Sequence, residues 1–218
     1  MPAGAHILEL GCGWGAFAET AARAGYRVTG VSLSEAQTAY ARERVARAGL
    51  ADRVELRIRD YRDVTGQFDG VASIEMFEAV GERYWPTYFQ ALKSALKPGA
   101  RACIQAITIG DDRFEQYRQT SDFIQQYIFP GGMLASPTQI AVRAGAAGLR
   151  MADAYRFGKD YGETLRRWLA RFDSRIEAVR AQGFDLRFIR CWRFYLAYSI
   201  AGFASETTDV GQYAFVPA

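Results

Sequence analysis

The chain has 218 residues, of which 50% are hydrophobic, 14% aromatic and 23% charged. This balance is typical of one packed globular domain and excludes a disordered chain. The three cysteines lie far apart, and His6 is the only histidine. A disulfide framework, a thiolate or histidine metal site and Ser-His-Asp chemistry are therefore not expected.

No apolar run approaches the roughly 20 residues that span a bilayer, and the first residues lack the basic and apolar regions of a signal peptide. We therefore expect a cytoplasmic protein. The formal net charge of +3 is unevenly spread, because residues 150–193 hold eleven Lys/Arg against six Asp/Glu. Such an excess is typical either of a surface that attracts anionic partners or of an ordinary solvated helix face.

The first half of the chain alternates short β-branched runs with helical periodicity, which predicts βαβ units and a mostly parallel sheet with helices on both faces. A helix is predicted to begin at Ser34, where Ser34 and Gln37 have the spacing of a capping box. Another is predicted to end before a turn at Lys97-Pro98-Gly99. The predicted strands are His6–Leu10, Arg27–Leu33, Val54–Arg59, Gly70–Ile74 and Ala100–Ile109.

The second half begins with an insertion, residues 111–134, in which we expect a helix from Phe114 and a turn at Pro130-Gly131-Gly132. Ser136-Pro137 predicts the start of a further helix, with proline at its first position. The remaining predicted elements are a strand at Met151–Phe157, two long helices between Tyr161 and Thr207, and a last strand at Gln212–Val216.

The segment Glu9-Leu10-Gly11-Cys12-Gly13-Trp14-Gly15 follows a predicted strand and opens a predicted helix. Glycines at such a turn let a ligand approach the backbone N–H groups and the helix N-terminus closely. The same spacing also fits the dinucleotide fingerprint, so the glycines alone do not identify the ligand. A triphosphate site is not expected, because no Gly-Lys-Ser/Thr follows.

The positions of the acidic residues favour S-adenosylmethionine over a nicotinamide dinucleotide. A dinucleotide site needs an acid about 20 positions on, at the end of the second strand, but that strand ends in Val31-Ser32-Leu33-Ser34. The acidic residues lie elsewhere: Glu9 precedes the glycines, and Asp60 follows the third predicted strand. The predicted cofactor residues are Glu9, Gly11, Gly13, Trp14, Gly15, Ser32, Leu33, Gln37, Asp60, Tyr61 and Ile74.

Four of these residues have simpler interpretations that the sequence leaves open. Glu9 also fits a surface acid, and Trp14 fits ordinary core packing. Gln37 also fits a partner in the capping box that begins at Ser34. Asp60 also fits the start of a turn.

With these residues in view, the sequence resembles the cyclopropane fatty acid synthases, including the mycolic acid cyclopropane synthases. The resemblance covers essentially the whole chain and implies a single class I methyltransferase domain over residues 1–218, with a seven-stranded Rossmann-like sheet. Besides the glycine segment and Val31-Ser32-Leu33-Ser34, it rests on residues 73–81 (SIEMFEAVG), 126–132 (QYIFPGG) and 192–196 (WRFYL).

The resemblance implies a reaction in which the cis double bond of a phospholipid acyl chain takes the methyl carbon of S-adenosylmethionine. A carbocation forms, and a bound bicarbonate removes the proton that closes a cyclopropane ring. By position, Glu78 corresponds to the glutamate that orients bicarbonate and Tyr195 to the tyrosine that contacts it. Gln105 stands where the family often has histidine, and Ile107 offers its backbone N–H. Ala79 also replaces a usual histidine.

The resemblance implies unsaturated phospholipid acyl chains as partners, and hence peripheral association with the inner face of the membrane. Leu165-Arg166-Arg167-Trp168-Leu169, with Arg171, has the composition of an interfacial helix, although an ordinary surface helix fits it equally. Aromatic residues such as Phe77, Tyr127 and Phe194 fit the wall of an apolar pocket, or simple core. We expect no nucleic-acid partner and leave a homodimer open.

Other functions remain open at this point. The carbocation can end as a methyl or methylene branch in place of a ring. A small-amine N-methyltransferase shares the fold and parts of the motifs and needs no bicarbonate. A third reading is a catalytically silent cofactor-binding module, because family members carry an upstream segment that has no counterpart in this sequence.

Overall fold

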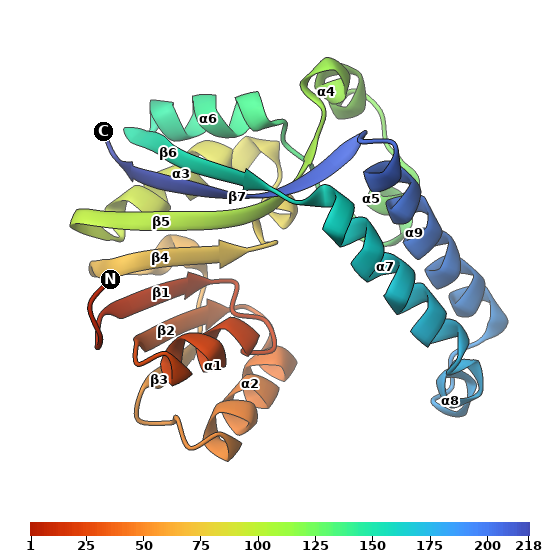
Figure 1. The fold of residues 1–218 in the computed structure, drawn as a ribbon, viewed down its shortest axis with the longest axis horizontal. Helices are drawn as coiled ribbons and strands as arrows, with labels where there is room; N and C mark the ends of the chain where they lie inside the picture. Colours follow the sequence, from red (N-terminus) through yellow and green to blue (C-terminus); the bar gives the residue numbers. More distant parts are fainter. The chain divides into compact units, whose positions relative to one another are not determined.

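The computed structural model describes all 218 residues and contains one seven-stranded sheet with the strand order β3-β2-β1-β4-β5-β7-β6 (Figure 1). Strands β1 to β5 pair in parallel, and the arrow of β7 points the opposite way (Figure 1). This confirms the predicted Rossmann-like, mostly parallel sheet. The strands are β1 His6–Leu10, β2 Arg27–Ser32, β3 Val54–Ile58, β4 Phe68–Ile74, β5 Leu96–Ile109, β6 Leu149–Arg156 and β7 Thr208–Pro217.

The chain divides into two compact units. The first comprises Met1–Ala106, Thr138–Ala154 and Gln212–Ala218, and the second comprises Ile107–Pro137 and Tyr155–Gly211. Strands β5, β6 and β7 therefore start in one unit and end in the other. A single catalytic domain over residues 1–218, with residues 111–134 as an insertion, stays a prediction.

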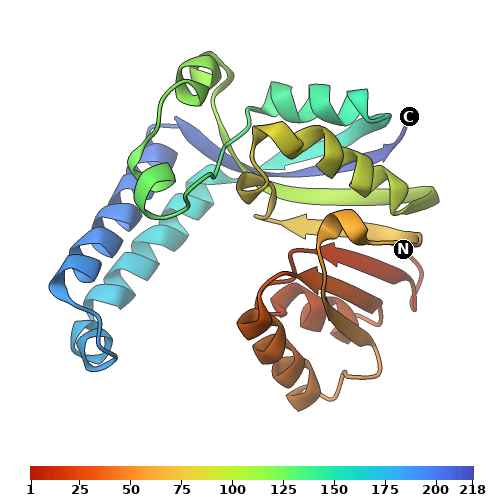
Figure 2. The ribbon, with the colours of Figure 1, turned by 180° about the vertical axis from the view of Figure 1, so that it is seen from behind.

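In the first unit, helices cover both faces of the sheet. Helices α1 and α2 lie on one face (Figure 1), and α3 and α6 lie on the other (Figure 2). The helices are α1 Ala16–Arg23, α2 Glu35–Arg47, α3 Trp85–Ser94 and α6 Pro137–Ala146, with short 3₁₀ turns η1 Tyr61–Asp63, η2 Phe77–Ala79 and η3 Glu82–Tyr84. The predicted helix starts at Ser34 and Ser136-Pro137 agree with α2 and α6.

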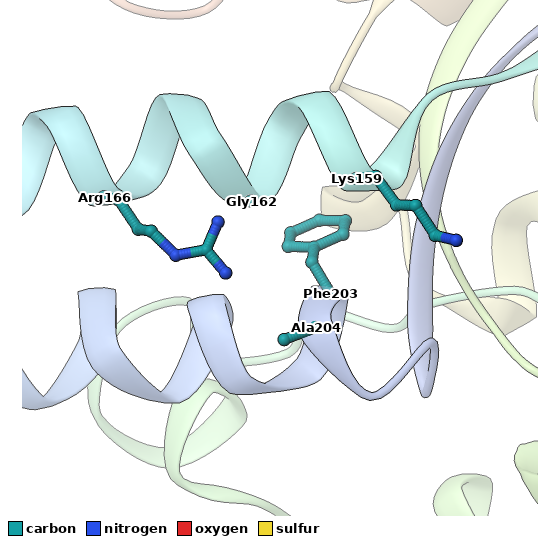
Figure 3. A pocket seen from close by; sticks show the side chains of 5 residues that line it. All are labelled: Lys159, Gly162, Arg166, Phe203 and Ala204. Carbon is teal, nitrogen blue, oxygen red and sulfur yellow. The ribbon is translucent and has the colours of Figure 1, made fainter.

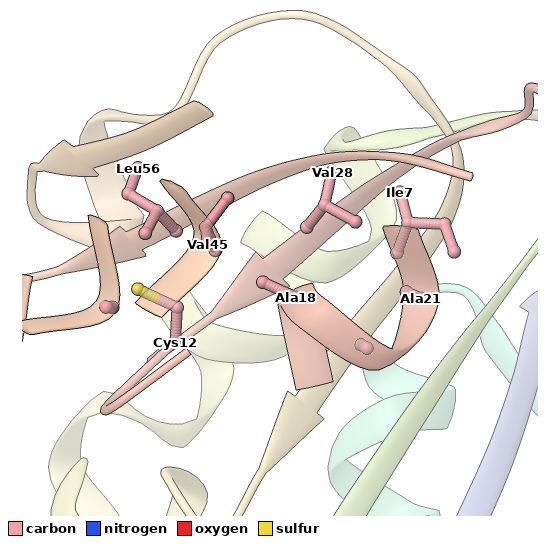
Figure 4. Packing of buried hydrophobic residues seen from close by; sticks show 9 residues of the cluster. Ile7, Cys12, Ala18, Ala21, Val28, Val45 and Leu56 are labelled. Carbon is pink, nitrogen blue, oxygen red and sulfur yellow. The ribbon is translucent and has the colours of Figure 1, made fainter. Parts of the chain in front are cut away.

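Small side chains let α1 and α2 pack closely on the strands beneath them. Ala18 and Ala21 of α1 are buried against strand residues such as Ile7 and Val28 (Figure 4). Gly30 of β2 belongs to this packing, because a Cβ atom there would lie 2.7 Å from Leu56 and 2.8 Å from Cys12. The opposite face holds a buried aromatic cluster of Phe77, Trp85, Tyr88, Phe89 and Phe215.

The second unit is mainly helical, with α4 Asp111–Arg118, α5 Phe123–Tyr127, α7 Gly158–Asp173, α8 Ile176–Ala181 and α9 Leu186–Ala204. Helices α7 and α9 pack along each other through Leu165, Leu196 and Phe203. They approach closely at Gly162, where an added Cβ would stand 3.4 Å from Cβ of Phe203 (Figure 3). No helix in the structure combines the length and the apolar character that crossing a bilayer requires.

Two predicted element starts and one predicted turn around strand β5 and helix α4 were wrong. Helix α4 begins at Asp111 and not at Phe114, because Asp111 and Asp112 suit the positive N-terminal end of a helix. Strand β5 begins at Leu96 and not at Ala100. Phe68 pairs with Leu96 whereas Gly70 pairs with Arg101, so the predicted turn at Pro98-Gly99 is an irregularity within the strand.

The helices and strands of the second half of the chain also differ from the prediction in number and in their boundaries. Three helices, α7, α8 and α9, occupy the region where two were predicted, because α8 forms in the connection between the long helices. Strand β6 starts two residues earlier than predicted, and β7 extends further at both ends. Boundaries of this kind depend on pairing partners that sequence patterns do not show.

Candidate functional site

A pocket of about 440 Å³ lies at the carboxyl ends of β1, β2 and β4. The strand order reverses between β1 and β4, and crevices at such a switch point are where open α/β sheets bind ligands. Seven of the predicted cofactor residues line this pocket. The lining residues are Gly11, Gly13, Val31, Ser32, Leu33, Ser34, Gln37, Arg59, Tyr61, Ile74, Glu75, Met76 and Ala79.

The glycine loop after β1 forms the middle of the pocket. Gly11, Gly13 and Gly15 all have positive φ, at 73°, 48° and 79°. A Cβ atom on Gly11 would lie 2.8 Å from the Met76 side chain, whereas one on Gly13 would meet nothing within 4 Å. The loop thus has the left-handed backbone and the open approach that a closely bound ligand needs.

The backbone of this loop differs from the prediction in one respect. The N–H groups of Gly11 and Cys12 both donate to the Val31 carbonyl, at 3.0 Å each. These two donors tie the loop to the end of β2 and are not directed at a ligand. Gly15 is the N-cap of α1, and an added Cβ there would stand 2.8 Å from Cβ of Ala41. Gly15 therefore serves helix packing and does not line the pocket.

Glu9 and Trp14 do not line the pocket either. Glu9 is only 3% exposed, which rules out the surface-acid interpretation, and its Oε2 atom has no hydrogen-bond partner. Burial raises the pKa of Glu9 to about 8, and a hydrogen bond from the Ala18 backbone offsets part of the rise. Trp14 is 52% exposed and packs edge-on against Tyr40. Their cofactor roles stay predictions.

Two hydrogen bonds to serine side chains order the connection between β2 and α2, which borders the pocket. The Ser34 N–H donates to Ser32 Oγ, and the Gln37 N–H donates to Ser34 Oγ, both at 3.2 Å. Ser34 is thus the N-cap of α2, as predicted. The cap places Gln37 in the first turn of α2, where its side chain lines the pocket.

After β3, Asp60 differs from the residues on either side of it in its contacts. Asp60 caps η1 and binds the Arg62 guanidinium through both oxygens, at 2.9 and 2.6 Å. These bonds from Arg62 lower the Asp60 pKa. Asp60 is not part of the pocket lining, whereas Arg59 and Tyr61 are. The cofactor contact predicted for Asp60 stays a prediction.

At the end of β4, Glu75 faces the pocket in a strained conformation, with φ of 51°. Its carboxylate accepts a 2.8 Å hydrogen bond from Gln105 Nε2, and Gln105 Oε1 accepts one of 3.1 Å from Gln212. Sequence reasoning used the segment around Glu75 as a family marker but missed its place in the pocket. Met76, Ala79, Arg59, Val31 and Ser34 were missed in the same way.

The predicted catalytic residues fall into two groups. Glu78 and Gln105 belong to the first unit, and Ile107 and Tyr195 belong to the second. Glu78 is half-buried in η2, one residue after the buried core side chain of Phe77. Ile107 and Tyr195 both pack against the core of the second unit. The ring centroids of Tyr195 and Trp192 lie 5.2 Å apart. A single catalytic set of these four residues stays a prediction.

A second hollow, of about 230 Å³, lies between α7 and α9 and is lined by Lys159, Gly162, Arg166, Phe203 and Ala204 (Figure 3). Its two cations already have acidic partners. Lys159 pairs with Glu206 at 3.0 Å, and Arg166 pairs with Glu163 at 3.8 Å. The larger pocket, with its glycine loop and strained glutamate, is therefore the candidate functional site.

The family model described as mycolic acid cyclopropane synthetase matches residues 1–213. The chain belongs to this family. The predicted family and the predicted fold are thereby confirmed, and the observed pocket lies where that fold has its ligand crevice.

Curated relatives support the same assignment. The chain is 48% identical over 214 residues, or 98% of its length, to the tuberculostearic acid methyltransferase UfaA1 of Mycobacterium tuberculosis. It is 34% identical over 97% of its length to the cyclopropane-fatty-acyl-phospholipid synthase of Escherichia coli K12. The chain spans about half the length of these relatives, 50% and 53%.

A solved structure shares the fold closely. The crystal structure of the mycolic acid cyclopropane synthase CmaA1, complexed with SAH and CTAB, superposes with a TM-score of 0.90. The match covers 99% of this chain and 79% of that one, at 23% identity. It establishes the architecture of the methyltransferase fold for this chain.

Proposed function

We propose that the protein transfers the methyl carbon of S-adenosylmethionine to the cis double bond of a phospholipid-bound unsaturated acyl chain. The observation that carries the proposal is the pocket at the β1/β4 switch point, lined by the glycine loop, Gln37 and Glu75. The glycines admit the methionine portion, and Ser32, Leu33 and Tyr61 flank the ribose and adenine. Membership of the cyclopropane synthase family supports a lipid alkene as the acceptor.

Glu78, Gln105, Ile107 and Tyr195 are the residues that we assign to the acceptor side of the reaction. An alkene is a weak nucleophile, and the carbocation that it forms must be kept from water until a proton leaves. In this proposal, bound bicarbonate takes that proton and the ring closes. Glu78 and Tyr195 orient the bicarbonate, and Gln105 and the Ile107 N–H donate hydrogen bonds to it.

A methyl or methylene branch is the second candidate product. It is favoured by the 48% identity to a relative named as a tuberculostearic acid methyltransferase. The same cation serves both outcomes, since ring closure and branching differ only in which proton leaves and whether a reduction follows.

Mass spectrometry of lipids from cells that express the protein tests the proposal. Methyl transfer to an acyl chain adds CH₂ both for a cyclopropane and for a methylene branch, which are isomers, and CH₂ plus two hydrogens for a methyl branch. The mass therefore separates the methyl branch, and ozonolysis separates the methylene branch from the ring. Unmodified lipids, together with methylation of small amines by the purified protein, would contradict the proposal.

The Glu78→Gln variant tests the catalytic assignment. The change keeps the shape of the side chain and removes its charge, so bicarbonate orientation should fail. We expect product formation to fall by at least about a hundredfold, as is typical for loss of a group that assists proton transfer. Cofactor binding should stay within about twofold of the wild type. An amine methyltransferase would keep most of its rate in this variant.

A further inference from the structure

Glu75 combines three features at the wall of the pocket. It is a non-glycine residue with φ of 51°, it lines the pocket, and a hydrogen bond from Gln105 holds its carboxylate. A non-glycine residue in the left-handed region is strained, and such strain persists where the surrounding structure over-determines it. At Glu75 the Gln105 carbonyl also accepts the backbone N–H, at 2.8 Å.

Hydrogen bonds fix the orientation of the Gln105 amide. Its Nε2 donates to Glu75, so its Oε1 faces the other way and accepts from Gln212 Nε2. Ile74 and Gln105 are paired neighbours on β4 and β5, and Gln212 comes from β7. Three strands therefore hold one carboxylate at the wall of the pocket.

The position of Glu75 along the pocket determines which part of the ligand it faces. Ser32, Leu33 and Gln37 follow β2, and Arg59 and Tyr61 follow β3, so these residues mark the adenine and ribose end. Glu75 follows β4, on the other side of the glycine loop. It therefore stands at the methionine end, where the sulfur lies.

We infer that Glu75 gives the pocket its preference for the cationic sulfonium donor over the demethylated product, and that Gln105 is the positioning residue for this carboxylate. The inference rests on the proposed binding of S-adenosylmethionine. The methionine portion of the donor carries an ammonium, a carboxylate and a sulfonium, for a net charge of +1. S-adenosylhomocysteine (SAH) lacks the sulfonium charge, so that portion has no net charge.

A carboxylate in a partly dry pocket attracts the donor more than the product, because only the donor has an uncompensated positive charge. The consequence is easier replacement of the product SAH by a new donor molecule. An enzyme whose pocket favours the charged donor exchanges SAH for a new donor molecule at a lower donor concentration.

Isothermal titration calorimetry with S-adenosylmethionine and with SAH tests this inference. In Glu75→Gln, we expect the donor affinity to fall about tenfold, equivalent to 1.4 kcal/mol, and the SAH affinity to change less than about twofold. Glu75→Gly should show the same loss and should fold, since glycine adopts this φ without strain. Glu43→Gln, an exposed glutamate on α2 outside the pocket, is the matched control and should leave both affinities unchanged.

The role of Gln105 is tested by the shorter Gln105→Asn side chain. It should lower the donor affinity about threefold and leave the SAH affinity unchanged. The double variant with Glu75→Gln should bind no more weakly than Glu75→Gln alone, because both changes remove the same interaction.

Two results would overturn the inference. Equal weakening of donor and SAH by Glu75→Gln would mean that the carboxylate faces a group that both ligands share. Unchanged affinities for both ligands in both Glu75 variants would mean that the carboxylate does not sense the sulfonium. Binding of neither ligand by the wild-type protein would overturn the cofactor assignment as well, which separates that failure from the other two.

Discussion

At the scale of single residues, two glutamates near the glycine loop occupy energetically unfavourable positions. Glu75 occupies a left-handed conformation at the pocket wall, and Glu9 is buried beneath the loop with one oxygen unpaired. Both are visible in the sequence as acids next to strand ends. Only the packing around them shows that one faces the pocket and the other does not, because burial depends on the neighbouring strands and helices.

Glu9 should make the stability of the ligand-free protein depend on pH. Burial raises its pKa from an ordinary 4.5 to about 8, so the folded state binds the proton more tightly than the unfolded state does. The stabilisation is fully present below about pH 4.5 and is lost as the pH rises to about 8. Its upper limit is about 5 kcal/mol, since one pKa unit corresponds to 1.36 kcal/mol.

Denaturant unfolding at pH 5.5 and pH 8.5 measures this dependence. Glu9→Gln cannot ionise and should lose less free energy of unfolding than the wild type between these two pH values. An identical loss in the wild type and in Glu9→Gln would show that Glu9 does not titrate as described.

At the scale of elements, helix α7 separates its apolar and basic faces. Leu165 is buried and Leu169 packs on the same core, whereas Arg167, Trp168 and Arg171 are exposed. The sequence predicted an amphipathic helix here, and the structure has one. We propose that this face meets the bilayer that holds the phospholipid acceptor, since its basic and aromatic side chains are those of an interfacial helix.

Vesicle sedimentation tests the membrane role of α7. We expect stronger binding to vesicles that contain phosphatidylglycerol than to vesicles of phosphatidylcholine alone, and weaker binding as salt screens the charges. Arg171→Glu changes two charge units and should weaken binding to the anionic vesicles about thirtyfold, at about 1 kcal/mol for each charge unit near the surface. Arg53→Glu, an exposed change in the first unit, is the control. Equal binding to both vesicle types would contradict an electrostatic role.

At the scale of the whole molecule, ligand binding should be readable as a change in global stability. A ligand at one hundred times its Kd stabilises the folded state by about 2.7 kcal/mol. For a protein of this size, each kcal/mol raises the Tm by about 2–4 °C. We therefore expect S-adenosylmethionine to raise the Tm by about 5–10 °C.

Two glycine variants make this measurement specific. Gly11→Ala places a Cβ atom 2.8 Å from Met76 at φ of 73° and should abolish the rise in Tm. Gly25→Ala has comparable strain at φ of 93°, meets nothing within 4 Å, and lies outside the pocket, so it should keep the rise. A normal rise in Gly11→Ala would contradict the placement of the ligand at the glycine loop.

The sequence by itself determined the sheet, the order of its elements and the location of the glycine loop, because these follow from hydrophobic period, helix caps and glycine spacing. It also placed Ser32, Leu33, Gln37, Tyr61 and Ile74 at strand and helix ends, where ligands bind in this fold. The tertiary structure decided which of the predicted residues face the pocket. It turned Asp60 toward Arg62, buried Glu9, and linked Glu75, Gln105 and Gln212 across three strands. Such contacts join residues as many as 107 positions apart, and no local pattern encodes a distance in space of that kind.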